Sequence, residues 1–209
     1  MTPAPHPEGG RVVVLMGPMA SGKSSVGAAL ATILGADFVD TDVRVVSTHG
    51  PIPEIFAAHG EDGFRDLEAR AVAEVLAENH PSGLVLALGG GAVLREETRE
   101  RLSGHDVVYL EVGWDDVAPR LAGSEDRPLL HGEAEASWRE LMERRRPVYE
   151  SVATIRVSAA NASAEEVAGR VASELSPAPA ARATAQAAAR SAAVELSPLE
   201  KELSRERRD

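Results

Sequence analysis

Eight residues near the start of the chain, G-P-M-A-S-G-K-S at positions 17–24, include the residue types that bind phosphate. The spacing is G-x-x-x-x-G-K-S, and its glycines let the backbone turn so that N–H groups point inward around phosphate oxygens. Lys23 supplies a compact positive charge, and the hydroxyl of Ser24 is a suitable ligand for Mg²⁺. The stretch therefore predicts a P-loop that binds a nucleoside triphosphate with its magnesium ion.

Lys23 is one of only two lysines among the 22 basic residues of the chain. An ammonium group can reach the β- and γ-phosphates from inside the loop, whereas the planar guanidinium of arginine is bulkier. A glycine-rich turn with a surface lysine is the alternative, but an apolar run precedes the pattern and a helical pattern follows it, as a P-loop requires. The nucleotide-binding residues predicted in this loop are Gly17, Ala20, Ser21, Gly22, Lys23, Ser24 and Ser25.

Two carboxylates, Asp40 and Asp42, stand two residues apart directly after a short apolar run. Such a pair can serve two functions in a phosphoryl transfer. One carboxylate can hold Mg²⁺ through water while the other accepts a hydroxyl proton. The alternative is a helix whose N-cap and first turn are acidic.

Arg65 and Glu68 are one helical turn apart, so an ion pair between them could orient Arg65 to bind an anion. An exposed salt bridge is the alternative. Gly89, Gly90 and Gly91 end another apolar run, where they permit close approach of a ligand and leave N–H groups free. A plain turn is the alternative there.

Arginines occupy two further segments. Arg127 lies in the polar stretch 123–135, and a loop of this kind could be a lid that brings positive charge to the transferring phosphoryl group. Three consecutive arginines, 144–146, precede Pro147, and a solvated run of charge is the usual interpretation of such a cluster.

An α/β fold is predicted to position these residues. Apolar, β-branched runs predict five strands, at 11–16, 37–40, 84–88, 107–112 and 154–157. Helical patterns lie between and after them, at 25–34, beyond 40 with breaks at 50–51 and 60, and at 95–102, 114–121, 137–146 and 164–175. We expect Pro147 to end the helix that starts at 137. Alternating strands and helices indicate a parallel sheet, whose carboxyl-end loops form the ligand site.

The composition excludes several kinds of protein. The chain has 209 residues and no cysteine, which excludes disulfides, thiolate metal sites and cysteine nucleophiles. A net charge of -11 argues against general nucleic-acid binding. No apolar run approaches the roughly 20 residues of a membrane span. We expect a monomer in the cytoplasm, with neither nucleic acid nor a membrane as partner.

The chain divides into three segments by composition. Residues 1–10 are predicted to be a flexible N-terminus, and residues 11–175 a single P-loop domain with a lid at about 123–135. Residues 176–209 are rich in alanine and proline and are predicted to be disordered, because they hold too few large apolar residues to offset the entropy of ordering.

Seven motifs, in order, resemble those of the shikimate kinases and cover the chain from about Arg11 to Leu175. They are G-P-M-A-S-G-K-S, F-V-D-T-D, I-P-E-I-F, G-E-D-G-F-R-D-L-E, A-L-G-G-G-A-V, R-P-L-L and R-R-R-P-V-Y. The resemblance implies a nucleoside-monophosphate-kinase-like P-loop fold, with a five-stranded parallel sheet flanked by helices and a lid. It also implies phosphorylation of the 3-hydroxyl of shikimate by ATP with Mg²⁺, a step toward chorismate and the aromatic amino acids.

The resemblance also implies a set of acceptor-binding residues. Asp42 would bond the shikimate hydroxyls and act as the catalytic base. Arg65 and Arg145 would bind the shikimate carboxylate together with the N–H of Gly91, and Gly89–Gly90 would belong to the same loop. Arg145 is chosen over its neighbours because it aligns with the family pattern R-x-P-x-Y.

On the nucleotide side, the resemblance implies that Asp40 lies near Mg²⁺ with Ser24. Arg127 would reach the phosphates from the lid, and Arg120 would lie against the adenine. Ala20 stands where relatives often have glycine. The catalytic residues implied are Lys23, Asp42 and Arg127.

Two other functions remain as alternatives. A kinase of gluconate or another sugar acid would share the P-loop, the size and a carboxylated polyol substrate. A non-catalytic nucleotide-binding module would be expected to lack Lys23, Asp42 or the arginine pair, and all of these are present.

Overall fold

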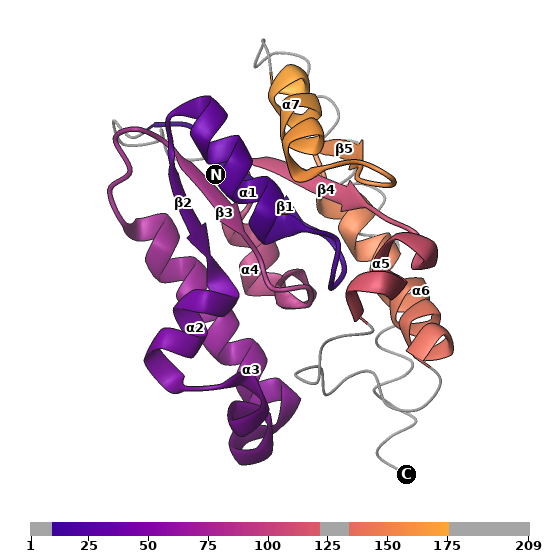
Figure 1. Ribbon diagram of the computed structural model, residues 1–209. Coiled ribbons are helices and arrows are strands. Elements are labelled where there is room, and N and C mark those ends of the chain that lie inside the picture. Colours follow the sequence, from indigo (N-terminus) through magenta and orange to yellow (C-terminus); the bar gives the residue numbers. More distant parts are fainter. Residues whose placement is uncertain (1–9, 122–133, 176–209) are drawn as a thin grey trace.

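The computed structural model describes residues 10–121 and 134–175 of the chain. It contains a five-stranded parallel sheet with the strand order β2-β3-β1-β4-β5 (Figure 1). The strands are Val12–Met16 (β1), Asp37–Asp40 (β2), Leu84–Ala87 (β3), Asp106–Glu111 (β4) and Ile155–Ser158 (β5). The predicted sheet is confirmed, and each strand begins and ends within one residue of its predicted bounds.

Helices cover both faces of the sheet (Figure 1). They are α1 (Lys23–Leu34), α2 (Thr41–His49), α3 (Ile52–Ala77), the 3₁₀ turn η1 (Ala92–Leu94), α4 (Glu96–Arg101), α5 (Trp114–Leu121), α6 (Ala134–Val152) and α7 (Ala164–Glu174). α1 and α7 lie side by side on one face, and α3, α4 and α6 cover the other (Figure 1).

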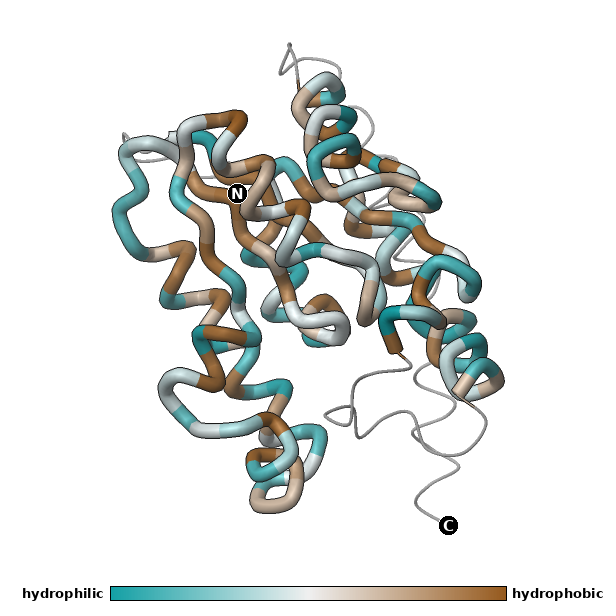
Figure 2. The backbone as a smooth tube through the Cα atoms, viewed as in Figure 1, coloured by the Kyte–Doolittle hydropathy of each residue, from teal (hydrophilic) through white to brown (hydrophobic). Residues whose placement is uncertain are grey.

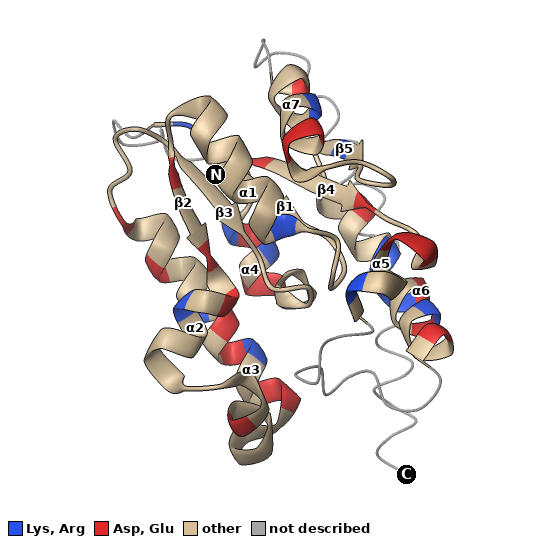
Figure 3. Ribbon diagram, viewed as in Figure 1, with Lys and Arg blue, Asp and Glu red and all other residues tan. Residues whose placement is uncertain are grey.

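The sequences of the central strands are unbroken apolar runs because these strands are buried on both faces. Every residue of β3 and all but the first of β1 are buried. Figure 2 shows the hydrophobic colour concentrated along these strands, and Figure 3 shows charged residues on the helices and strand ends. The parallel register pairs Leu15 of β1 with Ala87 of β3, and Asp40 of β2 with the same alanine. The segments that follow these three strands therefore start at one edge of the sheet.

Two predicted helix boundaries are confirmed by backbone geometry. Gly35 ends α1 with a left-handed φ of 64°, and its N–H donates to the carbonyl of Ala31. Gly60 interrupts α3 with a φ of 68°, so that the helix is kinked at that residue.

The predicted end of one helix is wrong. The helix expected to stop before Pro147 continues to Val152. Its first turn begins with Ala134 and Glu135, which the sequence places in the lid. Proline cannot donate a backbone hydrogen bond and crowds the preceding turn, which costs about 3 kcal/mol in a helix interior. Packing offsets this cost, because Tyr149 beyond the proline is fully buried against β4.

Residues 1–9, 122–133 and 176–209 lie outside the described residues, and the second of these ranges includes Arg127 and most of the predicted lid. Of the helices in the described part, none combines the length and apolar character needed to cross a membrane.

Candidate active site

The P-loop links β1 to α1 and curls around the side chain of its lysine. Lys23 donates hydrogen bonds from Nζ to the carbonyl oxygens of Gly17 and Pro18, at 3.0 and 2.8 Å. Gly22 caps α1 with a φ of 89°, a conformation that favours glycine. Ala20 has a φ of 61° and so adopts the left-handed region with a side chain. The loop thus has the tight turn that the pattern G-x-x-x-x-G-K-S predicts.

The start of α1 is suited to an anion. Gly22 makes no side-chain cap, and the first turn contains no acidic residue. The first N–H groups of a helix have no partner within the helix and carry its partial positive charge. A phosphate group would accept hydrogen bonds from these N–H groups and would balance the partial positive charge, as it does at other P-loops. Ser21 and Ser25 belong to the same stretch, with Ser21 buried and Ser25 exposed.

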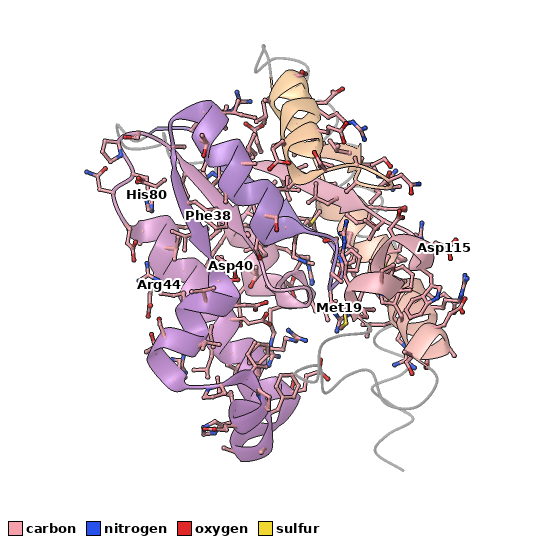
Figure 4. The ribbon with its side chains drawn as sticks, viewed as in Figure 1. Met19, Phe38, Asp40, Arg44, His80 and Asp115 are labelled. Atoms are coloured by element: carbon pink, nitrogen blue, oxygen red, sulfur yellow. The ribbon has the colours of Figure 1, made fainter. Side chains whose placement is uncertain are left out.

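Ser24 and Asp40 meet at the carboxyl end of β2. The hydroxyl of Ser24 donates to Oδ2 of Asp40 at 2.5 Å, and Oδ1 of the same carboxylate accepts from the N–H groups of Asp42 and Val43 at 2.9 and 3.3 Å. Asp40 therefore caps α2, as the alternative interpretation of the acidic pair expects, and it also faces the P-loop through Ser24. A hydroxyl beside a carboxylate fits Mg²⁺, which proteins hold through one or two carboxylates together with substrate phosphates. Figure 4 labels Asp40 at the end of β2 and Met19 on the P-loop.

The loop after β3 begins at Gly89, which is enclosed by two carboxylates. A side chain at Gly89 would overlap Oε1 of Glu68 and would lie 2.6 Å from Oδ1 of Asp42. The N–H of Gly89 donates to Oγ1 of the buried Thr41 at 2.9 Å. Glycine is thus required here for space, and Asp42 lies beside this loop.

Gly90 and Gly91 make two further close approaches. A Cβ atom at Gly90 would lie 3.3 Å from the backbone nitrogen of Met19 on the P-loop, and a side chain at Gly91 would overlap the guanidinium of Arg65. Neither glycine has a left-handed φ. The structure therefore brings the predicted glycine loop, Arg65 and the P-loop into contact.

Arg65 and Glu68 form a buried ion pair. Only 6% of Arg65 and 1% of Glu68 are exposed, and Nη1 of Arg65 donates to Oε2 of Glu68. A second bond joins Nη2 of Arg65 to Glu61 at 3.2 Å. Among the described residues, Nε of Arg65 and Oε1 of Glu68 are buried without a hydrogen-bond partner. The alternative of an exposed salt bridge is therefore wrong.

Burial by itself shifts the pKa values of the two members of this pair in opposite directions. It raises the pKa of Glu68 to about 7, although the nearby charge of Arg65 opposes the shift. Burial also works against the charged guanidinium of Arg65, but Glu68 and Glu61 outweigh it and leave the pKa of Arg65 raised. Arg65 therefore stays positively charged in its buried position.

The three consecutive arginines of α6 have different environments. Arg145 is buried, with 4% exposed, and its Nη1 donates to the carbonyl oxygen of Gly90 at 3.4 Å. Arg144 and Arg146 are exposed, and Arg144 pairs with Glu140 one turn away at 2.5 Å. The usual interpretation as a solvated run of charge thus holds for Arg144 and Arg146, while Arg145 points toward the glycine loop.

Arg120 reaches the P-loop from α5. Its Nη1 donates to the carbonyl oxygen of Ala20 at 2.9 Å. Arg127 lies outside the described residues, so the structure gives no position for it.

Sequence reasoning assigned no role to two residues that contact the glycine loop. Thr41 accepts the N–H of Gly89, and the hydroxyl of Tyr149 donates to the carbonyl oxygen of Gly90 at 2.5 Å. Thr41 stands between the two predicted aspartates, and Tyr149 closes the motif R-R-R-P-V-Y four residues after Arg145. Their positions in these motifs were the signal that could have drawn attention to them.

Comparisons with known proteins agree with the geometry. Residues 19–176 match a family model described as shikimate kinase. A shikimate kinase of Thermobifida fusca is 46% identical over 165 residues, which cover 78% of this chain and 94% of that protein. A shikimate kinase of Salinispora arenicola is 49% identical over 165 residues, which cover 78% of this chain and 97% of that protein.

Solved structures give the same result. A shikimate kinase from Acinetobacter baumannii in complex with shikimate has a TM-score of 0.74 and 34% identity, and the match covers 79% of this chain and 92% of that one. The predicted P-loop, nucleoside-monophosphate-kinase-like fold is confirmed by this likeness. A gluconokinase from Sinorhizobium meliloti matches with a TM-score of 0.52 and 22% identity over 79% of this chain and 95% of that one. This second match shows a similar fold alone.

Proposed function

The chain belongs to the shikimate kinase family, and we propose how its residues share the work of the family's reaction. It is an enzyme that transfers the γ-phosphoryl group of ATP to the 3-hydroxyl of shikimate. The products are shikimate 3-phosphate and ADP, on the route to chorismate and the aromatic amino acids. The observation that carries the assignment of roles is the loop of three glycines, which contacts a carboxylate, two buried arginines and the P-loop.

The acceptor binds beside Gly89–Gly91. Shikimate carries a carboxylate at one end and hydroxyls at the other, so its site needs cations at one side and an acceptor of hydrogen bonds at the other. Arg65 and Arg145 provide the cations, and the burial of both supports this role because ion pairs strengthen away from water. Asp42 faces Gly89 and accepts hydrogen bonds from the hydroxyls.

In the transfer itself, the 3-hydroxyl oxygen attacks the γ-phosphorus while Asp42 accepts the hydroxyl proton. The bond from the γ-phosphorus to the bridging oxygen breaks, and ADP leaves. Such a reaction needs mainly positioning and neutralisation of charge. Lys23 and the N–H groups of the P-loop hold the phosphates, and the contact between Gly90 and Met19 supports a short path from one substrate to the other.

Ser24 and Asp40 are the residues that would hold Mg²⁺, which supplies further neutralisation of phosphate charge when bound. The hydrogen bond between their oxygens supports this assignment. The remaining loop residues, Gly17, Ala20, Ser21, Gly22 and Ser25, contact the nucleotide with Lys23.

Arg120 lies against the adenine, and its bond to Ala20 on the P-loop supports that position. Arg127 reaches the phosphates from the lid, a role that rests on the family resemblance. A monomer in the cytoplasm, with no nucleic acid or membrane as partner, remains our expectation for the whole protein.

The test is ADP release with ATP and Mg²⁺, measured with shikimate, quinate and gluconate as acceptors and with Lys23→Ala as the blank. We expect activity with shikimate alone. Activity with gluconate in its place would overturn the acceptor assignment and leave the P-loop assignment standing. ATP binding without transfer to any acceptor would favour a non-catalytic module.

A further inference from the structure

The carbonyl oxygen of Gly90 accepts hydrogen bonds from two side chains of one helix. The hydroxyl of Tyr149 donates to it at 2.5 Å, and Nη1 of Arg145, one turn earlier on α6, lies 3.4 Å from it. Tyr149 is fully buried, and its ring packs against that of Tyr109 on β4 with 5.2 Å between ring centroids. The phenol therefore has a fixed place, with its hydroxyl directed at the glycine loop.

The bond to Gly90 also determines where the next N–H points. The carbonyl of Gly90 and the N–H of Gly91 belong to one planar peptide unit, and in a trans peptide the two groups point in opposite directions. No cis peptide occurs among the described residues. Since the carbonyl of Gly90 is directed at α6, the N–H of Gly91 is directed away from that helix. In the described part of the chain this N–H has no acceptor.

Consecutive glycines cannot hold such a peptide in place by themselves. They have no side chains to restrict rotation, and glycine is the residue with the most backbone freedom to lose. The loop needs glycine because Arg65 and Glu68 fill the space of any side chain. Restraint must come from other elements, and two hydroxyls provide it, with Thr41 bonded to the N–H of Gly89 and Tyr149 to the carbonyl of Gly90.

We propose that Tyr149 is a positioning residue for the acceptor, which holds the Gly90–Gly91 peptide so that the N–H of Gly91 can donate to the substrate carboxylate. The inference rests on the proposed function, in which that carboxylate binds Arg65 and Arg145. Burial raises the pKa of Tyr149 to about 12, so its hydroxyl keeps its proton and remains a donor at any working pH. A phenylalanine would pack equally well against Tyr109, and only the hydroxyl reaches Gly90.

The test compares Tyr149→Phe with Tyr109→Phe. The chain has only these two tyrosines, and the substitutions remove the same atom from the two members of one pair of packed rings. For Tyr149→Phe we expect the KM for shikimate to rise about tenfold, in line with loss of an aligned bond to a charged group. The KM for ATP and kcat should change less than about twofold. Tyr109→Phe should leave both KM values unchanged. If Tyr149→Phe is unstable at room temperature, the comparison is made in the cold with sucrose, which favours the folded state.

A second acceptor separates positioning from packing. With a shikimate analogue that lacks the carboxyl group, Tyr149→Phe and the parent enzyme should have the same KM, because the N–H of Gly91 then has nothing to bind. An equal loss with both acceptors, or a lower melting temperature with an unchanged KM for shikimate, would overturn the proposal. Failure of the parent enzyme to phosphorylate shikimate would instead overturn the proposed function, so the two failures are distinguishable.

Discussion

At the scale of single residues, the site depends on charges that are buried close to one another. Arg65, Glu68 and Arg145 are all nearly inaccessible, and Asp42 lies beside Glu68 at Gly89. Removing one member of a buried charged set leaves the others without compensation, so substitutions here affect both stability and activity. A substitution in this set therefore needs a control variant or a condition that separates the two effects.

Asp42→Asn tests the proposed role of Asp42 as the catalytic base. We expect kcat to fall by about 10²- to 10⁴-fold, the usual contribution of a general base, because an amide cannot accept the hydroxyl proton. ATP binding should persist, since the P-loop is unchanged. Asp62→Asn, which alters a carboxylate that is 96% exposed on α3, is the matched control and should leave kcat unchanged. Near-normal turnover in Asp42→Asn would remove this residue from the mechanism.

Glu68 predicts a pH dependence of stability. Burial raises its pKa from 4.5 in the unfolded chain to about 7 in the folded protein. Between these values the folded protein binds more protons than the unfolded chain, so the free energy of unfolding falls as the pH rises toward 7 and levels off above it. One group contributes a slope of at most ~1.4 kcal/mol per pH unit.

Glu68→Gln should remove that slope. Chemical denaturation at several pH values between about 5 and about 8 measures it, and the stability of the variant relative to the parent protein should increase with pH. A constant difference between the two proteins over this range would show that Glu68 titrates normally.

The left-handed backbone at Ala20 predicts that replacing this residue with glycine stabilises the protein. Its φ of 61° costs a residue with a side chain about 1 kcal/mol, a cost that glycine does not incur. Ala20→Gly should therefore raise the free energy of unfolding by up to about 1 kcal/mol, measured by urea denaturation. Ala28→Gly, at an exposed position within α1, should lower it by about the same amount, because there the backbone is helical. The same sign for both substitutions would contradict the strain argument.

At the scale of elements, α6 is the helix that sequence rules misjudge. It passes through Pro147 and carries Arg145 before the proline and Tyr149 after it, both directed at Gly90. Were the helix to end at Arg146, Tyr149 would have no fixed relation to Arg145. Because α6 continues through Pro147, Arg145 and Tyr149 are aligned to contact the same carbonyl group, that of Gly90.

Pro147→Ala tests the cost of that proline. The substitution restores a backbone donor within α6, so we expect the free energy of unfolding to increase by about 1–3 kcal/mol. Pro53→Ala is the control, because Pro53 lies in the first turn of α3, where no donor is needed. The expected change for the control is close to zero. Thermal and urea unfolding measure the free energy of unfolding of both variants. A larger increase in Pro53→Ala than in Pro147→Ala would contradict the stated cost of Pro147.

At the scale of the whole molecule, the sheet was predictable because its strands are buried on both faces and therefore read as apolar runs. The P-loop was predictable because its chemistry lies in eight consecutive residues. Contacts across the fold were not predictable from local patterns. The bond from Tyr149 to Gly90 joins residues 59 positions apart, and the inward orientation of Arg145 among three arginines depends on how α6 is rotated against the sheet.

The wide spacing of these contacts along the chain has a consequence for folding kinetics. Ser24 meets Asp40 across 16 positions, Thr41 meets Gly89 across 48, and Tyr149 meets Gly90 across 59. Isolated helices form within about a microsecond, whereas long loops and parallel strands pair much later. During refolding from denaturant, helical signal should therefore return well before the capacity to phosphorylate, because the acceptor site exists only once the last of these distant segments has docked.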